Sequence, residues 1–137
     1  MTDLARSHFI LYVSDQEESR RFYEHVLGRP PSLHVPGMTE FRLGAETILG
    51  LMPEQGIARL LQLDPAALPA RGGLRGEVYL VVSTPEAYHQ RACEAGAREL
   101  SPYALRDWGD WAAYSRDPDG YVLVFAGPDR LARGAVS

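Results

Sequence analysis

Two stretches of the chain show the same pattern of apolar and polar positions. Residues 8–13 and 77–82 are rich in β-branched, aromatic and aliphatic side chains, a composition typical of β-strands. A serine follows each stretch, and a glutamate lies three residues after that serine. Each copy then runs through a helical pattern to a glycine, Gly28 in the first and Gly96 in the second. The repeat predicts two copies of one structural module.

In the first copy, apolar residues at helical spacing predict a helix that packs on a sheet. Ser14 is expected to cap its N-terminus, with Glu17 closing a capping box. Gly28 should end it, because glycine adopts the left-handed conformation at no steric cost. The inner face of this helix is predicted to be formed by Ser19, Phe22, Tyr23, Val26 and Leu27. Strands are expected at roughly 31–35, 39–43 and 46–52.

In the second copy, a helix is predicted to open at Thr84-Pro85, because proline is well tolerated in the first turn. Its inner face should be formed by Tyr88, Ala92 and Ala95. The segment Asp117-Pro118-Asp119-Gly120 is a strong tight-turn signal between the last two strands. Those strands and the one before them are expected near 98–104, 111–116 and 121–126.

The sequence therefore predicts one α+β domain over residues 1–137, built of two strand-helix-strand-strand-strand (βαβββ) modules. The modules span residues 7–52 and 76–127. Residues 53–75 are rich in Pro and Gly and are expected to connect them, with a short helix near 56–62.

Composition narrows the range of partners. The net charge is −4, and Lys and Arg form no cluster, which argues against nucleic acid and anionic membranes. The apolar runs have strand length, so no segment is expected to cross a bilayer. Cys93 is the single cysteine, which excludes an internal disulfide and, without a signal peptide at the start, indicates a cytoplasmic protein.

Strand alternation assigns side chains to opposite faces of each sheet. His8, Ile10 and Tyr12 share one face of the first strand. In the second copy Glu77 and Tyr79 take the matching positions. A face that packs on a helix is a poor place for an imidazole or a carboxylate, so His8 and Glu77 are predicted to line a cavity enclosed by the sheets.

Four segments carry a family resemblance, His8–Asp15, Arg21–Gly28, Trp108–Asp110 and Asp117–Gly120. Together they resemble the vicinal oxygen chelate superfamily, which includes glyoxalases, extradiol dioxygenases, fosfomycin-modifying enzymes and bleomycin-resistance proteins. The resemblance covers about residues 7–127. It implies paired βαβββ modules whose curved sheets form a cavity, and it implies a homodimer.

The metal enzymes of this superfamily carry four ligand positions, which fall here on His8, Glu77, Gly50 and Val124. Gly50 and Val124 have no side-chain donor, so two of the four ligands are missing. One imidazole and one carboxylate make a weak site for a divalent ion. We therefore expect no cofactor, with a divalent metal kept as the alternative.

Two functions remain open. The first is metal-free binding or sequestration of a small aromatic or amphipathic molecule, as in bleomycin-resistance proteins. The ligand-binding candidates for this function are His8, Met52, Glu77, Tyr79, Trp108 and Trp111. The alternative is an enzyme of the same superfamily, a lyase, isomerase or dioxygenase, in which His8 and Glu77 act as general base and acid with or without metal. An iron dioxygenase needs a second histidine ligand, and His25, His34 and His89 lie at positions without a matching partner.

Overall fold

The computed structural model describes residues 6–62, 64, 66, 76–107 and 110–127. The chain divides into two compact units, residues 1–24 with 28–70 and residues 25–27 with 71–137. Among the described residues, the strands form two four-stranded mixed sheets, one from the first half of the chain and one from the second. This confirms the predicted α+β class and the two βαβββ modules.

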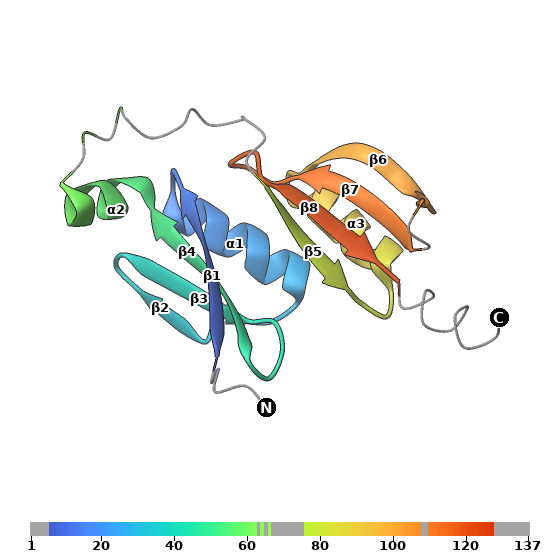
Figure 1. Cartoon of the computed structure of the whole chain (residues 1–137), viewed down its shortest axis with the longest axis horizontal. Helices are drawn as coiled ribbons and strands as arrows, with labels where there is room; N and C mark the ends of the chain where they lie inside the picture. The colour runs from blue at the N-terminus through green and yellow to red at the C-terminus, as the bar shows by residue number, and fades with distance from the viewer. Residues whose placement is uncertain (1–5, 63, 65, 67–75, 108–109, 128–137) are drawn as a thin grey trace. The chain divides into compact units, whose positions relative to one another are not determined.

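The first sheet has the strand order β1-β4-β3-β2, with β1 and β4 parallel and the other pairs antiparallel. Two helices accompany it, α1 after the first strand and α2 after the last (Figure 1). The elements are β1 (Ser7–Val13), α1 (Gln16–Leu27), β2 (Leu33–Val35), β3 (Met38–Arg42), β4 (Thr47–Pro53) and α2 (Glu54–Leu61). The short helix of the connector thus begins two residues earlier than the sequence predicted.

The N-terminus of α1 corrects one expectation. Asp15, not Ser14, is the N-cap, and its side chain accepts a hydrogen bond from the backbone N–H of Glu18. Both residue types can cap a helix, but the extended backbone that a cap requires occurs at Asp15. The C-terminal prediction is confirmed, since Gly28 adopts the left-handed conformation with φ of 69°.

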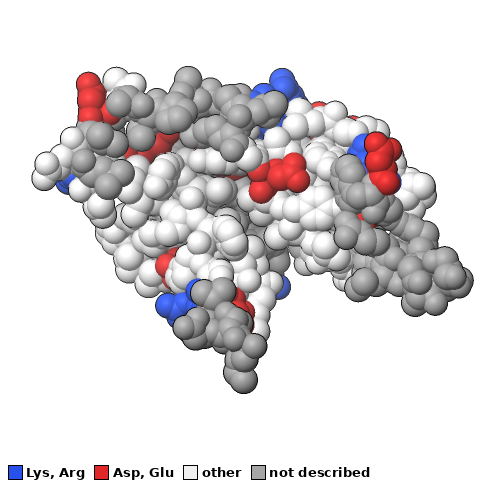
Figure 2. Space-filling view, viewed as in Figure 1, with Lys and Arg blue, Asp and Glu red and all other residues white. Residues whose placement is uncertain are grey.

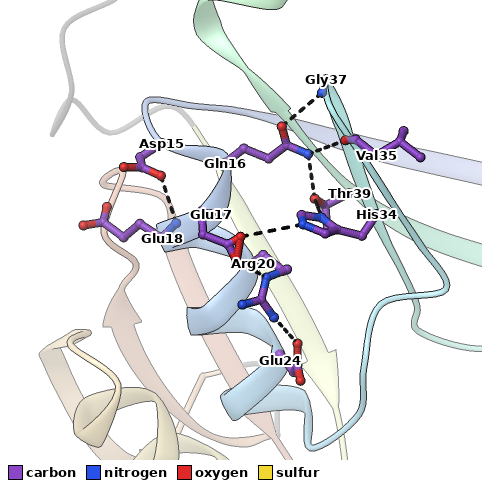
Figure 3. Close-up of polar contacts among 10 residues, drawn as sticks. All are labelled: Asp15, Gln16, Glu17, Glu18, Arg20, Glu24, His34, Val35, Gly37 and Thr39. Carbon is purple, nitrogen blue, oxygen red and sulfur yellow. Dashed lines mark hydrogen bonds and ion pairs between the residues drawn. The ribbon is translucent and has the colours of Figure 1, made fainter.

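Gln16, in the first turn of α1, holds the β2–β3 hairpin (Figure 3). Its amide nitrogen donates to the carbonyl oxygen of Val35 at 2.8 Å and to the hydroxyl of Thr39 at 2.9 Å. Its amide oxygen accepts the backbone N–H of Gly37 at 3.0 Å. Thr39 Oγ1 also lies 2.7 Å from Nδ1 of His34. One amide group therefore satisfies polar groups on both strands and at the turn between them.

The two faces of the first sheet differ in burial. On one face Val13, Thr39, Phe41, Leu49 and Leu51 are buried, whereas Phe9 at the outer end of the same face is 62% exposed. Ser19, Phe22 and Tyr23 of α1 are buried as well, as the helical pattern predicted. The opposite face carries His8, Ile10 and Tyr12 of β1, in register with Ile48, Gly50 and Met52 of β4.

The second sheet has the order β5-β8-β7-β6, with β5 and β8 parallel. Its elements are β5 (Glu77–Val81), α3 (Pro85–Glu94), β6 (Arg98–Leu105), β7 (Trp111–Arg116) and β8 (Val122–Ala126). Helix α3 packs on this sheet (Figure 1), and the Tyr88 ring lies 5.5 Å from the Phe125 ring. Ala92 is buried as predicted, whereas Ala95 caps the helix and the remaining buried positions are Pro85 and His89.

The predicted turn between β7 and β8 is confirmed. The carboxylate of Asp117 accepts the backbone N–H groups of Asp119 and Tyr121, both at 2.9 Å. Gly120 has a positive φ of 91°, and its N–H donates to the carbonyl of Asp117. A buried carboxylate therefore fixes the turn that brings β8 back along β7.

Two properties of the described part of the chain bear on its partners. None of its helices has the length and apolar character needed to span a bilayer. On the face drawn in Figure 2, the basic side chains of the described residues do not gather into one patch.

Candidate functional site

In the first unit, His8 lies between two charged side chains. Its Nδ1 is 3.5 Å from a carboxylate oxygen of Glu40 on β3, and its Nε2 accepts a hydrogen bond from Nε of Arg6 at 2.8 Å. A guanidinium can only donate, so Nε2 must carry the lone pair, and the neutral ring therefore has its proton on Nδ1, toward Glu40. The imidazole is held in one tautomer between a cation and an anion.

Glu40 is a site residue that sequence reasoning missed. It lies on β3, directly opposite Gly50 of β4, while His8 comes from β1 on the other side of β4. A Cβ added at Gly50 would lie 3.0 Å from Cγ1 of Ile10 and 3.4 Å from Sδ of Met38. Gly50 is therefore buried beneath the side chains of Ile10 and Met38, which leave little room for a larger side chain at this position. Only the β3–β4 register reveals that a carboxylate stands next to the glycine.

The same face of the first sheet is mainly apolar. Ile10 and Tyr12 are 41% and 37% exposed, and Met52, the register partner of Tyr12, is half-buried. The predicted ligand-binding residues His8 and Met52 therefore lie on one sheet face.

In the second unit, Glu77 and Tyr79 of β5 share a face with Tyr114 of β7. Val124 of β8 lies between the two tyrosines in register, and it is completely buried with Ala112 and Ala126. Tyr79 and Tyr114 pack against this apolar floor. The position that corresponds to a metal ligand in the superfamily is thus part of a hydrophobic cluster.

Polar groups border this tyrosine face. The hydroxyl of Tyr79 donates to the buried carboxylate of Asp110 at 2.5 Å. Burial raises the pKa of Tyr114, the negative charge of Glu77 raises it further, and the positive charge of Arg106 opposes these effects. Asp110 adds a smaller upward effect on the same pKa. Glu77 and Arg106 therefore act in opposite directions on Tyr114, although the three residues come from different segments.

A cleft of about 400 Å³ opens beside Tyr114. It is lined by Ser101, Leu105, Arg106, Asp107 and Tyr114. Two register shifts in β6, between Glu99 and Ser101 and between Ser101 and Ala104, determine which side chains of β6 reach it. Such bulges cannot be located from apolar alternation alone, so sequence reasoning missed this cleft.

Trp111 lies elsewhere. Strand alternation places it on the sheet face opposite Tyr114 and Glu77. Its register partner Leu105 lies at the end of the edge strand β6, where it lines the cleft although Trp111 does not. Its ring is 5.7 Å from the Tyr103 ring, and the residue is 37% exposed. The other predicted tryptophan, Trp108, lies outside the described residues.

Three further histidines have structural partners. His89 is buried on α3 with Nε2 2.8 Å from a carboxylate oxygen of Glu99, and Sγ of Cys93 is 3.9 Å from the same nitrogen. Burial and the charge of Glu99 raise the pKa of the Cys93 thiol, which disfavours the reactive thiolate. His34 contacts Thr39, as described above, and His25, at the end of α1, has Nε2 3.7 Å from a carboxylate oxygen of Glu94.

The donor set does not fit the metal site of the superfamily. Gly50 and Val124 have no donor atom, and Val124 lies in an apolar cluster. Within the described ranges, no group of three or more His, Cys, Asp or Glu side chains is arranged to hold a metal ion. His8 and Glu77 belong to different units, so their predicted pairing stays a prediction.

Comparisons with known proteins agree with the fold. A glyoxalase-related enzyme from Fulvimarina pelagi is 22% identical, with a TM-score of 0.74 over 90% of this chain and 87% of that chain. A glyoxalase/bleomycin resistance protein/dioxygenase from Nocardioides is 25% identical, with a TM-score of 0.72 over 93% and 85%. A lactoylglutathione lyase from Agrobacterium tumefaciens is 21% identical, with a TM-score of 0.64 over 91% and 94%.

A search of curated protein sequences returns no significant match. The family model for the Glyoxalase/Bleomycin resistance protein/Dioxygenase superfamily matches residues 6–125, which include α1, α2, α3 and every strand of the described sheets except the last residue of β8. This chain therefore belongs to the glyoxalase/bleomycin resistance protein/dioxygenase superfamily.

Proposed function

We propose that this protein binds a small aromatic or amphipathic molecule without a metal, and that the cleft beside Tyr114 is part of the binding site. The supporting observation is the character of its walls. Leu105 and the Tyr114 ring offer apolar surface, while Ser101, Arg106 and Asp107 offer polar groups. A volume of about 400 Å³ lies within the range of small-molecule sites, about 300–1,000 Å³.

Other predicted ligand contacts extend this proposal. Glu77 and Tyr79 share the sheet face of Tyr114, so a ligand in the cleft can reach toward them. His8 and Met52 are proposed contacts on the face of the first sheet. Trp111 packs on Tyr103 on the opposite face of the second sheet and is not part of this cleft.

Two exposed leucines on β6 provide a matched test. Leu105 lines the cleft and is 55% exposed, whereas Leu100 is 42% exposed and does not line it. The neutral probe is indole-3-propanamide, and binding is measured by isothermal titration calorimetry. Leu105→Ala should weaken binding several-fold, since about 1 kcal/mol of buried apolar area is lost. Leu100→Ala should leave binding unchanged.

Calorimetry with chelator tests the metal-free part of the proposal. Affinity for indole-3-propanamide should not change after dialysis against EDTA, and protein purified without chelator should contain metal well below one equivalent. Binding that disappears with EDTA and returns with a divalent ion would contradict metal-free binding. Absence of saturable binding, or equal loss in both leucine variants, would contradict the proposed cleft.

The His8–Glu40 pair favours a second candidate, a superfamily enzyme that uses His8 as general base. Glu40 fixes the imidazole tautomer, which leaves the Nε2 lone pair available to take a proton once substrate displaces Arg6. The assay follows formation of lactoylglutathione, the compound for which the Agrobacterium relative is named. Activity should be lost in His8→Ala and kept in His25→Ala. Equal activity in both variants would eliminate this candidate.

The resemblance and the single cysteine support two further parts of the proposal, a homodimer and a cytoplasmic location. Light scattering coupled to gel filtration tests the first, and a mass of one chain, 15.2 kDa, would contradict it.

A further inference from the structure

Arg106 is anchored in the cleft by the backbone. Its Nε and Nη2 donate to the carbonyl oxygen of Ala112 at 3.1 and 2.7 Å, and Nη2 also donates to the carbonyl oxygen of Pro102 at 2.6 Å. Cζ of the guanidinium lies 5.0 Å from the centre of the Tyr114 ring. These contacts hold the planar group in one orientation, so little conformational entropy remains to be lost when it binds a ligand.

The anchoring contacts do not neutralise the charge of Arg106. Carbonyl oxygens carry only partial charges, and the ion pairs found among the described residues do not include Arg106. Within the described part of the chain, Nη1 makes no hydrogen bond. A half-buried guanidinium in a cleft with an unused donor is a group that prefers a carboxylate partner.

We infer that the cleft selects an aromatic ligand that carries a carboxylate, with the carboxylate bound by Arg106 and the ring packed on Leu105 and Tyr114. This inference rests on the proposed binding function and names the class of its ligand. Asp107 lines the same cleft and could attract an ammonium group, but it is exposed. Exposed charges are screened by water and contribute little to binding, whereas the half-buried and oriented guanidinium is screened less.

The surrounding charges determine how the ligand is oriented. Glu77 and Asp110 both act to raise the pKa of Tyr114, which shows that negative charge acts at its hydroxyl. A ligand carboxylate is therefore repelled from the side of Glu77 and attracted to Arg106. The acid group should lie at the Arg106 end of the cleft.

Two probes with the same ring test this selectivity. Indole-3-propionate carries a carboxylate, and indole-3-propanamide replaces it with a neutral amide of nearly equal size. Both are titrated by calorimetry at about pH 7 into the wild-type protein, Arg106→Gln, Arg106→Lys and Arg98→Gln. Arg98 is an exposed arginine at the other end of β6 and does not line the cleft, so it controls for the loss of one positive charge.

The wild-type protein should bind the acid about tenfold or more tightly than the amide, the ratio expected for one charge-assisted contact. Arg106→Gln should remove this preference, so that the acid and the amide bind with similar affinity, while saturable binding of the amide reports an intact cleft. Arg106→Lys keeps the charge but loses the planar fork, so part of the preference should remain. Arg98→Gln should keep all of it.

Different results separate the inference from the function on which it rests. Equal binding of acid and amide by the wild-type protein overturns the carboxylate assignment without any variant, and it leaves the proposed binding function standing. A preference that survives in Arg106→Gln overturns the role of Arg106. Failure of both probes to bind the wild-type protein overturns the binding function and this inference with it.

Discussion

Replacing Val124 with glutamate would place a carboxyl group at a position that carries a ligand in the metal enzymes of the superfamily. We expect this substitution to destabilise the protein strongly. Val124 is 0% exposed and packs with Ala112, Ala126 and the two flanking tyrosines. Losing the burial of the valine side chain costs about 1.5–3 kcal/mol.

The larger cost comes from keeping the new carboxyl group protonated at about pH 7. A glutamate carboxyl has a pKa of about 4.3 in an unfolded chain, and at this buried position it should stay uncharged at about pH 7. Keeping it protonated costs about 3.7 kcal/mol, because each pH unit above the unfolded pKa adds about 1.36 kcal/mol. The combined loss of about 5–7 kcal/mol is comparable to the whole stability of a small domain, about 5–15 kcal/mol.

The pH dependence has a definite sign. The substituted carboxyl binds a proton in the folded state and has lost it in the unfolded state at about pH 7, so stability rises as the pH falls. Lowering the pH to about 5 should recover about 2.6 kcal/mol relative to the wild-type protein measured at the same two pH values.

Urea unfolding followed by circular dichroism at both pH values measures these losses. The control is Val81→Glu, because Val81 lies on the same face of the neighbouring strand but is 59% exposed. The control should lose no more than about 0.5 kcal/mol. A loss below about 1.5 kcal/mol for Val124→Glu, unchanged between the two pH values, would refute the apolar assignment and show that this position can hold a solvated or paired carboxylate.

Three further predictions follow from the local geometry. Gly28→Ala should lower the free energy of unfolding, measured in urea, by about 1–2 kcal/mol, because φ at this position is 69°. No atom lies within 4 Å of the added Cβ, so a steric clash does not contribute to this loss. Gly44→Ala is the control, because its Cβ would also meet no atom within 4 Å but its φ is not positive, and it should leave the free energy of unfolding unchanged. Gln16→Ala should lower the free energy of unfolding by about 2 kcal/mol, because the hydrogen bonds from Gln16 to the β2–β3 hairpin are lost. Amide hydrogen exchange in β2 and β3 should become faster, and unchanged exchange would show that Gln16 does not hold the hairpin. Glu77→Gln should lower the pKa of Tyr114, seen by ultraviolet titration of tyrosine, because a charge that raises it is removed.

The sequence predicted the parts of the fold that depend on local structure. The repeated strand pattern indicated both modules, and the glycine after α1 marked the end of that helix because its conformation is local. The tight turn at residues 117–120 was predictable for the same reason, since its hydrogen bonds join residues at most four positions apart. The N-cap of α1 was misplaced by one residue because Ser14 and Asp15 have similar capping ability, and the backbone conformation that selects one of them is not a property of residue type.

The candidate site was predictable only in part. Alternation along a strand places His8, Glu77 and Tyr79 on definite faces, because successive side chains point to opposite sides. It does not reveal the neighbours of those residues on other strands. Glu40 contacts His8 from across an intervening strand, and Asp110 binds Tyr79 from a position 31 residues further along the chain.

By itself, the sequence determined the two modules, the strand faces and the absence of donor atoms at Gly50 and Val124. Only the tertiary structure decided that Glu40 stands beside Gly50, that Arg106 is anchored in a cleft with Tyr114, and that Trp111 lies on the other face. The physical reason is that side-chain alternation is a local property of one strand. Register and bulges depend instead on hydrogen bonds and packing between segments that are distant in the sequence.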